Sequence, residues 1–230
     1  MIVRGMDYKE IVKECYEDLC DCAPRAFKIL NSDKKLKKFI INLKRCCLKQ
    51  HPKKYYFKYF TLTSKNNNIV LILPSYDMEN KEFGLYSLVL YNFGSGFYVV
   101  EPINLGIHYK IYTPHFFDRF RERELKNPKL SKFDVISEFY KTRNAYRLPS
   151  DYSTVCRRTV RSVEKLPEKV KEKYPENSYI EPYGNRGLII LECLEESKID
   201  IVKTYLNFDI LKDNQIDVLT DLVQRSDIIV

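Results

Sequence analysis

The sequence has no tryptophan, only seven glycines and three histidines, and no long apolar run among its 230 residues. Because no apolar stretch approaches the roughly 18–20 residues of a membrane span, we expect no contact with a membrane. The first residues carry charges every few positions and lack the apolar core of a signal peptide. With seven cysteines, an odd number, these features predict a cytoplasmic protein with reduced thiols.

The scarcity of glycine and histidine also limits the chemistry. No glycine-rich phosphate loop is present, and residues 94–96 are typical of a hairpin turn. A zinc site could be assembled only from ligands whose spacing does not match paired C-x2-C motifs: Cys15, Cys20, Cys22, Cys46, Cys47 and His51. A second grouping, His108 and His115 with Asp118 or Glu122, has two arginines beside it, which disfavour a cation. We therefore expect neither a metal nor a cofactor.

Acidic residues are almost absent from residues 28–65, which we call the basic segment. It holds twelve Lys/Arg and one Asp, a net charge of +11, whereas the rest of the chain holds 27 basic and 30 acidic residues, a net charge of −3. Such a concentration is typical of a face that binds nucleic acid, although solvated lysine faces are also common. The predicted nucleic-acid contacts are Lys34, Lys37, Lys38, Lys44, Arg45, Lys53, Lys54 and Lys58.

Hydrophobic periodicity predicts an α+β protein, with an antiparallel meander, flanking helices and an N-terminal helical segment. We expect a basic helical segment at residues 1–52 and an α+β domain at residues 53–230. The alternative is that the two form one continuous domain. Pro24 is predicted to end or restart a helix, with a short helical piece through Leu30 as the second case. Pro74 is predicted to end a strand, and Ser32 and Ser131 to cap helices. Helices are expected at 7–22, 33–50, 132–143, 151–165 and 208–224, and strands at 54–63, 69–73, 85–91, 97–100, 107–112, 179–183, 187–193 and 199–206.

Residues 113–123 have the strongest pattern of a candidate site. Thr113 is suited to cap a helix and Pro114 to occupy its first position. The aromatic side chains of this stretch are spaced to face the core. The polar ones share the opposite face and are the predicted catalytic residues: His115, Arg119, Glu122 and Arg123. The helix N-terminus, His115 and the two arginines could together bind a phosphate. A surface helix held by Glu122 ion pairs explains the same pattern.

The spacing H-x-x-x-R-x-x-E-R, followed by Leu130-Ser131 and a helix with Val135-Ile136, resembles a signature of small RelE-like proteins. These include BrnT-type toxins of toxin–antitoxin systems and related domains of unknown function. The resemblance covers residues 110–206, interrupted around 150–180, and includes a late strand pair. It implies a microbial or phage-related protein with a RelE-like sheet, and a capacity for RNA cleavage.

Two hypotheses follow. In the first, the protein is an RNA-directed, metal-independent endoribonuclease with His115 as proton donor or acceptor and Arg119 and Arg123 as phosphate clamps. Tyr183 and Tyr205 could then stack on bases. In the alternative, the protein is a non-catalytic module whose lysine-rich face binds RNA, DNA or an acidic partner protein. The sequence leaves the oligomeric state open.

Overall fold

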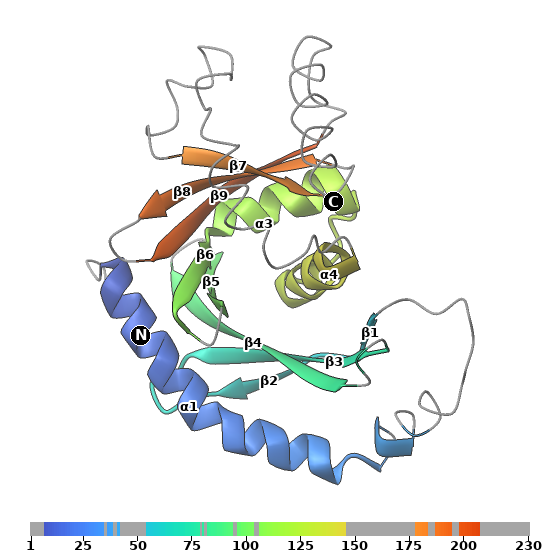
Figure 1. The fold of residues 1–230 in the computed structure, drawn as a ribbon. Coiled ribbons are helices and arrows are strands. Elements are labelled where there is room, and N and C mark those ends of the chain that lie inside the picture. Colours follow the sequence, from blue (N-terminus) through green and yellow to red (C-terminus); the bar gives the residue numbers. More distant parts are fainter. Residues whose placement is uncertain are drawn as a thin grey trace, which may run out of the picture. The chain divides into compact units, whose positions relative to one another are not determined.

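The computed structural model describes residues 7–34, 36–38, 41, 54–78, 80, 82–93, 96–103, 106–145, 178–183, 187–194 and 198–207. The chain forms two compact units. The first comprises residues 1–109 and 140–145, and the second comprises residues 110–139 and 146–230. Figure 1 shows helices together with antiparallel strands, which confirms the predicted α+β class.

The first unit is built on an antiparallel sheet. Its strands are β1 (Lys54–Tyr56), β2 (Phe60–Thr63), β3 (Ile69–Asp77), β4 (Glu82–Phe93) and β5 (Gly96–Ile103). β1 and β2 both pair with β3, and β3, β4 and β5 follow one another as the predicted meander. The apolar runs at 70–73 and 88–91 are buried at its centre, as expected for strands covered on both faces.

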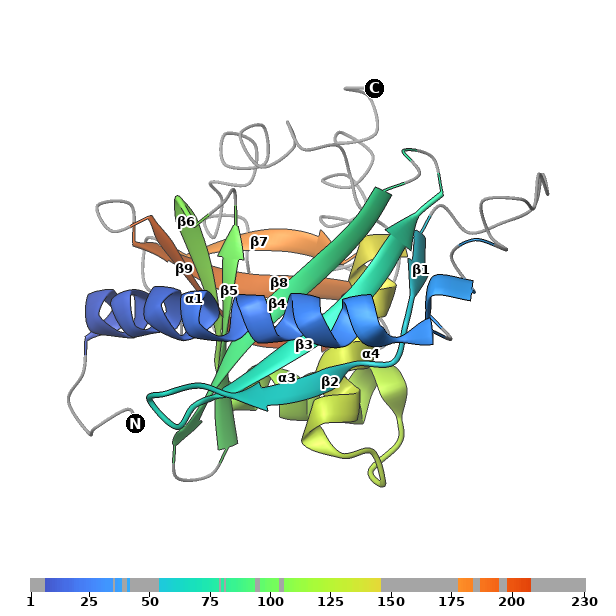
Figure 2. The ribbon, with the colours of Figure 1, turned by 90° about the horizontal axis from the view of Figure 1, so that it is seen from below.

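Helix α1 (Tyr8–Ser32) packs against β3 and β4 of this sheet, and Figure 2 shows it crossing them. Asp7 caps it, and Glu10 completes a capping box. The prediction that Pro24 ends this helix is wrong, because Pro24 lies inside it. The residues buried on the two sides of Pro24, Cys22 and Ala26, belong to one continuous face. Their burial against the sheet offsets the hydrogen bond that proline removes.

Two further local predictions, a strand end at Pro74 and a helix cap at Ser32, are also wrong. β3 continues through Pro74 to Asp77, because Pro74 lies opposite the gap between β1 and β2, where a missing N–H is tolerated. The Phe57 N–H donates to the Pro74 carbonyl there. The expected Ser32 cap is replaced by Asp33, whose carboxylate accepts the Leu36 N–H at 3.0 Å. Ser32 is the last residue of α1, so the break falls one residue later than predicted.

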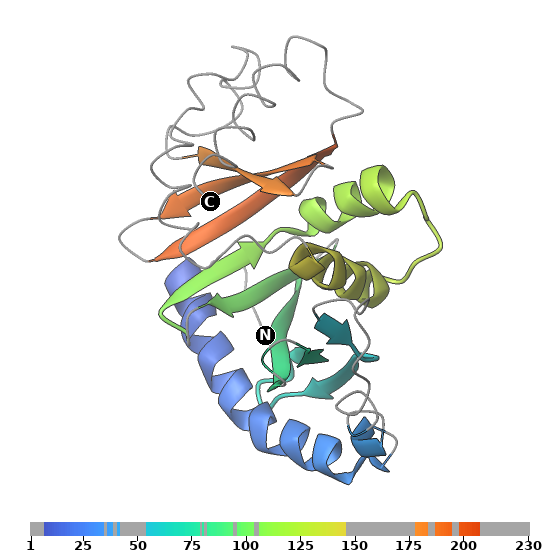
Figure 3. The same ribbon diagram turned by 45° about the vertical axis from the view of Figure 1, so that its right-hand side comes forward.

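The second unit places helices on a smaller antiparallel sheet. β6 (His108–Tyr112) enters it from the first unit and leads into α3 (Pro114–Phe120) and a π-helical turn, η1 (Arg121–Leu125). Helix α4 (Lys132–Ala145) follows, and β7 (Ser178–Tyr183), β8 (Gly187–Leu194) and β9 (Ile199–Asn207) pair in sequence. Figure 3 shows these last three strands as one layer, and α3 packs on β9. The predicted Ser131 cap of α4 is confirmed: its hydroxyl accepts the Asp134 N–H at 3.2 Å.

An aromatic cluster forms the core of the second unit. Its rings lie with centroids 5.1–6.3 Å apart, mostly edge to face, an arrangement that the ring quadrupole favours. Tyr183 and Tyr205 are 3% and 0% exposed, so the hypothesis that they stack on bases is wrong. The members are Tyr112, Phe116, Phe117, Phe120, Phe139, Tyr183 and Tyr205.

Several predicted elements lie outside the described residues: the helices at 151–165 and 208–224, part of the helix at 33–50, and the turn at 94–95. Of the 33–50 helix, residues 34, 36–38 and 41 are described and helical. Within the ranges given above, no helix is both long and apolar enough to cross a membrane.

Candidate nucleic-acid interface and the His115 helix

Four of the predicted nucleic-acid contacts, Lys34, Lys37, Lys38 and Lys58, have described side chains, and all four are exposed. We call these four residues the lysine surface. In the part of the chain that the structure describes, none of them has an acidic partner. Lys44, Arg45 and Lys53, and the side chain of Lys54, lie outside the described residues.

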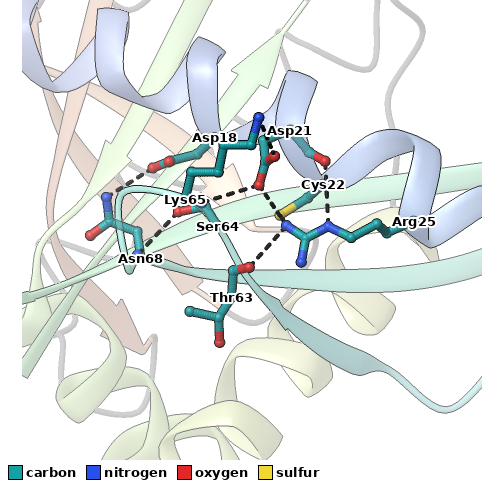
Figure 4. Close-up of polar contacts among 8 residues, drawn as sticks. All are labelled: Asp18, Asp21, Cys22, Arg25, Thr63, Ser64, Lys65 and Asn68. Atoms are coloured by element: carbon teal, nitrogen blue, oxygen red, sulfur yellow. Dashed lines mark hydrogen bonds and ion pairs between the residues drawn. The ribbon is translucent and has the colours of Figure 1, made fainter.

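The C-terminal half of α1 is clamped to the turn between β2 and β3, as Figure 4 shows. Arg25 donates to the Thr63 carbonyl at 2.9 Å and forms an ion pair with Asp21 at 2.6 Å. Asp21 in turn accepts the backbone N–H of Lys65 at 3.1 Å. These bonds join residues about forty positions apart and fix the basic end of α1 beside the hairpin.

Asn68 makes the second half of this clamp. Its amide donates to Asp18 at 2.9 Å and to Glu14 at 2.7 Å, both on α1. Asp18 is 1% exposed, so its side-chain oxygens depend on such donors in place of water. Ser64 closes the turn by accepting the Asn68 N–H at 3.1 Å. This network could not be predicted from the sequence, because its members lie about fifty residues apart.

The start of α3 confirms the predicted cap. Thr113 Oγ1 accepts the Phe116 N–H at 3.4 Å, and Pro114 occupies the first helical position. The same hydroxyl lies 3.1 Å from the carbonyls of Val202 and Lys203, to which it can donate. The Thr113 N–H donates to the Val202 carbonyl. The cap is therefore bound to β9, and two of its donors are already used within the protein.

Three of the four predicted catalytic residues are brought together on the exposed side of this helix. The Arg119 Nε–H donates to His115 Nε2 at 3.5 Å, at the long end of hydrogen-bond geometry. Arg119 also forms an ion pair with Glu122 at 2.8 Å. His115 and Glu122 are exposed, whereas Phe116, Phe117 and Phe120 are buried as predicted.

The fourth residue, Arg123, points elsewhere. Its guanidinium donates to the Tyr205 carbonyl at 2.6 Å, and the Asn207 amide donates to the Arg123 carbonyl at 3.0 Å. The Tyr205 hydroxyl donates to Glu124 at 2.7 Å. The π-helical turn η1, which has a wider spacing than an α-helix, thus fastens the helix to the end of β9. Glu124 and Asn207 were not singled out from the sequence, because their partners lie over eighty residues away.

Two of the described cysteines are part of the core packing. Cys15 and Cys22 are buried on the sheet-facing side of α1, and burial raises the pKa of both thiols. Among the described residues, no group of three His, Cys, Asp or Glu side chains is arranged to hold a metal ion. Cys46, Cys47 and His51, which were weighed as zinc ligands, lie outside those residues.

Comparisons of the chain with protein-family models, with curated proteins and with solved structures gave no match.

Proposed function

We propose that the protein binds nucleic acid, RNA in the first instance, through the lysine surface. The observation that carries this proposal is the state of the four lysines: all are exposed, and none has an acidic partner in the described part of the chain. A lysine that forms no ion pair within the protein can neutralise a phosphate without first breaking an internal contact.

The charge distribution supports the same proposal. The basic segment carries +11 although the rest of the chain is slightly acidic, so the positive potential is concentrated. A concentrated potential attracts a polyanion, and each phosphate that is neutralised releases condensed counterions. The Asp21–Arg25 and Asn68 contacts hold the hairpin to α1, which supports the end of this segment on a rigid base.

The test is a titration of fluorescent single-stranded RNA with the full chain at several salt concentrations. Replacing Lys34, Lys37 and Lys38 with Gln should weaken binding and lower the slope of log affinity against log salt by about two, because each single-stranded phosphate contact contributes roughly 0.7. The matched control replaces Lys9, Lys13 and Lys129, three exposed lysines outside the basic segment, with Gln. This control removes the same net charge.

Equal loss of affinity in the two variants would contradict the proposal, because net charge rather than the lysine surface would then govern binding. Absence of binding to RNA and to duplex DNA at low salt would also contradict it. Capture of an acidic protein by the wild type, but not by the lysine variant, would then favour the alternative of a protein-binding module.

A second candidate function is metal-independent RNA cleavage at the His115 helix. It is favoured by the exposed grouping of His115, Arg119 and Glu122, and by the resemblance to RelE-like proteins, which would make the chain microbial or phage-related. In this reaction the His115 imidazole would accept the proton of a ribose 2′-hydroxyl as the oxygen attacks the adjacent phosphorus. Arg119 would stabilise the added negative charge, and the 5′-oxygen would leave with a proton from water.

This candidate is tested by incubating the protein with total RNA in EDTA. Cleavage that persists in EDTA and is lost in both the His115→Ala and Arg119→Ala variants would support it. The control is Lys132→Ala, an exposed change on α4 away from the grouping. Intact RNA with the wild type, or cleavage that survives in both variants, would contradict catalysis at His115 and leave the binding function unaffected.

A further inference from the structure

The exposed side of α1 carries a line of apolar residues that the core does not use. Tyr16 and Phe27 are 61% and 55% exposed, and the exposed Cys20 and Ala23 lie between them. The spacing i, i+4, i+7, i+11 places all four on one face of the helix. A hydrogen bond with Cys20 raises the pKa of Tyr16, which shows that these two side chains are neighbours on that face. We call these four residues the α1 stripe.

The α1 stripe is distinct from the face that packs on the sheet. That buried face consists of Ile11, Cys15, Asp18, Cys22, Ala26 and Leu30. A helix on the surface of a globular protein normally has one apolar face, which packs on the core, and its other faces are polar. Two exposed aromatic rings are aligned along a second face of α1. Because aromatic residues are enriched at protein–protein interfaces, a contact with another protein would explain this second face.

The charges of α1 indicate what kind of partner fits. Residues 7–21 contain six acidic residues and two lysines, whereas the rest of α1, residues 22–32, contains two basic residues, Arg25 and Lys28, and no acidic residue. Beside the stripe, Glu17 follows Tyr16 and Lys28 follows Phe27, and both side chains are exposed. In the described part of the chain, neither has an ion-pair partner. One half of the helix is thus complementary in charge to its other half.

We propose that α1 pairs with α1 of a second copy of this chain in antiparallel orientation. Only the antiparallel orientation places the acidic half of each helix against the basic half of the other. It lays Tyr16 of one copy near Phe27 of the other, and it brings Glu17 of each copy near Lys28 of the other. The two ion pairs are related by the two-fold axis, as in other symmetric dimers.

This pairing is independent of nucleic-acid binding, because neither Glu17 nor the stripe belongs to the lysine surface. A contact made by one helix from each copy is small, so we expect a dimer that dissociates in the micromolar range. With the stripe centred between residues 21 and 22, the two Cys20 residues lie roughly 4–5 Å apart along the axis. Packed helix axes lie 8–10 Å apart and each facing Cα atom lies about 2.3 Å from its own axis, so the Cα atoms of the two Cys20 residues are about 6–8 Å from one another.

The first test is sedimentation of the full chain from about 5 to 200 µM. The wild type should form a dimer in this range, and Phe27→Glu should remain monomeric. The matched control is Ile107→Glu, which also places a charge at an exposed apolar residue of the first unit but away from α1. Circular dichroism of each variant verifies that the fold is retained. A wild type that stays monomeric at the highest concentration would overturn the proposal.

The second test is a charge exchange. Glu17→Lys and Lys28→Glu should each weaken the dimer, because each places like charges across the interface, and the double variant should restore it. Restoration distinguishes an antiparallel pair of identical helices from attachment to any other surface. If the double variant is as weak as the single variants while the wild type dimerises, the orientation proposed here is wrong.

The third test is crosslinking with a short bismaleimide whose spacer is about 8 Å. Cys20 should be crosslinked between copies, and Cys20→Ser should lose that product. Cys15 and Cys22 are buried, and their raised pKa keeps the thiols protonated and slow to react, so they contribute little background. A dimer that forms in sedimentation but shows no Cys20-dependent crosslink would contradict the α1 pairing.

Discussion

The lysine surface and the His115 helix both carry several cations, but the two sets of cations have different partners. The four lysines are exposed, and in the described part of the chain no carboxylate holds them. On the His115 helix, Arg119 is held by Glu122, and Arg123 donates to the Tyr205 carbonyl. A cation that is already bound within the protein must give up that contact before it can bind a ligand.

This difference separates two uses of basic residues. Arginines with partners in the same chain fasten elements together, whereas lysines without such partners remain available to a polyanion. We therefore expect that substitutions around the His115 helix affect mainly folding stability, and that substitutions in the lysine surface affect mainly binding. Four measurements of stability test this difference between the two regions.

The largest effect is expected from Phe120→Ala, because Phe120 is 0% exposed and contacts the rings of Phe116, Phe139, Tyr183 and Tyr205. Removal of a buried aromatic ring leaves a cavity and should lower the free energy of unfolding by about 3–5 kcal/mol. Urea denaturation measures it, with Ile107→Ala as an exposed control that stays within about 0.5 kcal/mol. A loss below that of an exposed site would show that α3 is not a core element.

Asn68→Ala should cost about 2–3 kcal/mol, because it removes the amide that donates to the buried Asp18 and to Glu14. Asn92→Ala, an exposed asparagine on β4, serves as the control in the same denaturation experiment. If both changes cost the same, the clamp between α1 and the hairpin contributes nothing to stability, and the support proposed for the basic segment is lost.

Arg123→Ala should cost about 1–2 kcal/mol, because its hydrogen bond to the Tyr205 carbonyl is partly buried. Arg119→Ala should cost less than about 1 kcal/mol, because its ion pair with Glu122 is exposed. This pair of variants compares an arginine that fastens η1 to β9 with an arginine whose ion pair lies on the exposed side of α3. The reverse order of costs would mean that the roles of the two arginines are exchanged.

The smallest effect on stability is expected from the triple Lys→Gln change at positions 34, 37 and 38. Exposed side chains without internal partners should alter the free energy of unfolding by no more than about 0.5 kcal/mol. Thermal denaturation of this variant, compared with its Lys9, Lys13 and Lys129 counterpart, measures the effect. A large loss of stability would show that these lysines make contacts within the protein.

The sequence predicted what depends on neighbouring residues. The Thr113 cap, Pro114 at the first helical position and the Ser131 cap of α4 are decided within three or four residues, and all are confirmed. The strands of the meander were also predicted, because continuous apolar runs are typical of buried strands. Pro24 and Pro74 were misjudged because distant contacts decide their tolerance: burial of the α1 face for one, and the gap between β1 and β2 for the other.

The candidate site was predicted less completely than the fold. Helical spacing placed His115, Arg119 and Glu122 together, and the structure does so as well. It could not reveal that Arg123 binds the Tyr205 carbonyl, or that Tyr183 and Tyr205 are core residues, because both facts depend on strands about sixty to eighty residues away. Counting charges identified the basic segment. Only the side-chain contacts show which of its described lysines have no acidic partner among the described residues.

We propose that the lysine surface, rather than the His115 helix, makes the main contact with RNA. This proposal is tested by photocrosslinking of the full chain to RNA containing 4-thiouridine, followed by mass spectrometry. We expect crosslinked peptides within residues 28–65, and their loss in the triple Lys→Gln variant. Crosslinks confined to residues 110–125, unchanged in that variant, would contradict it.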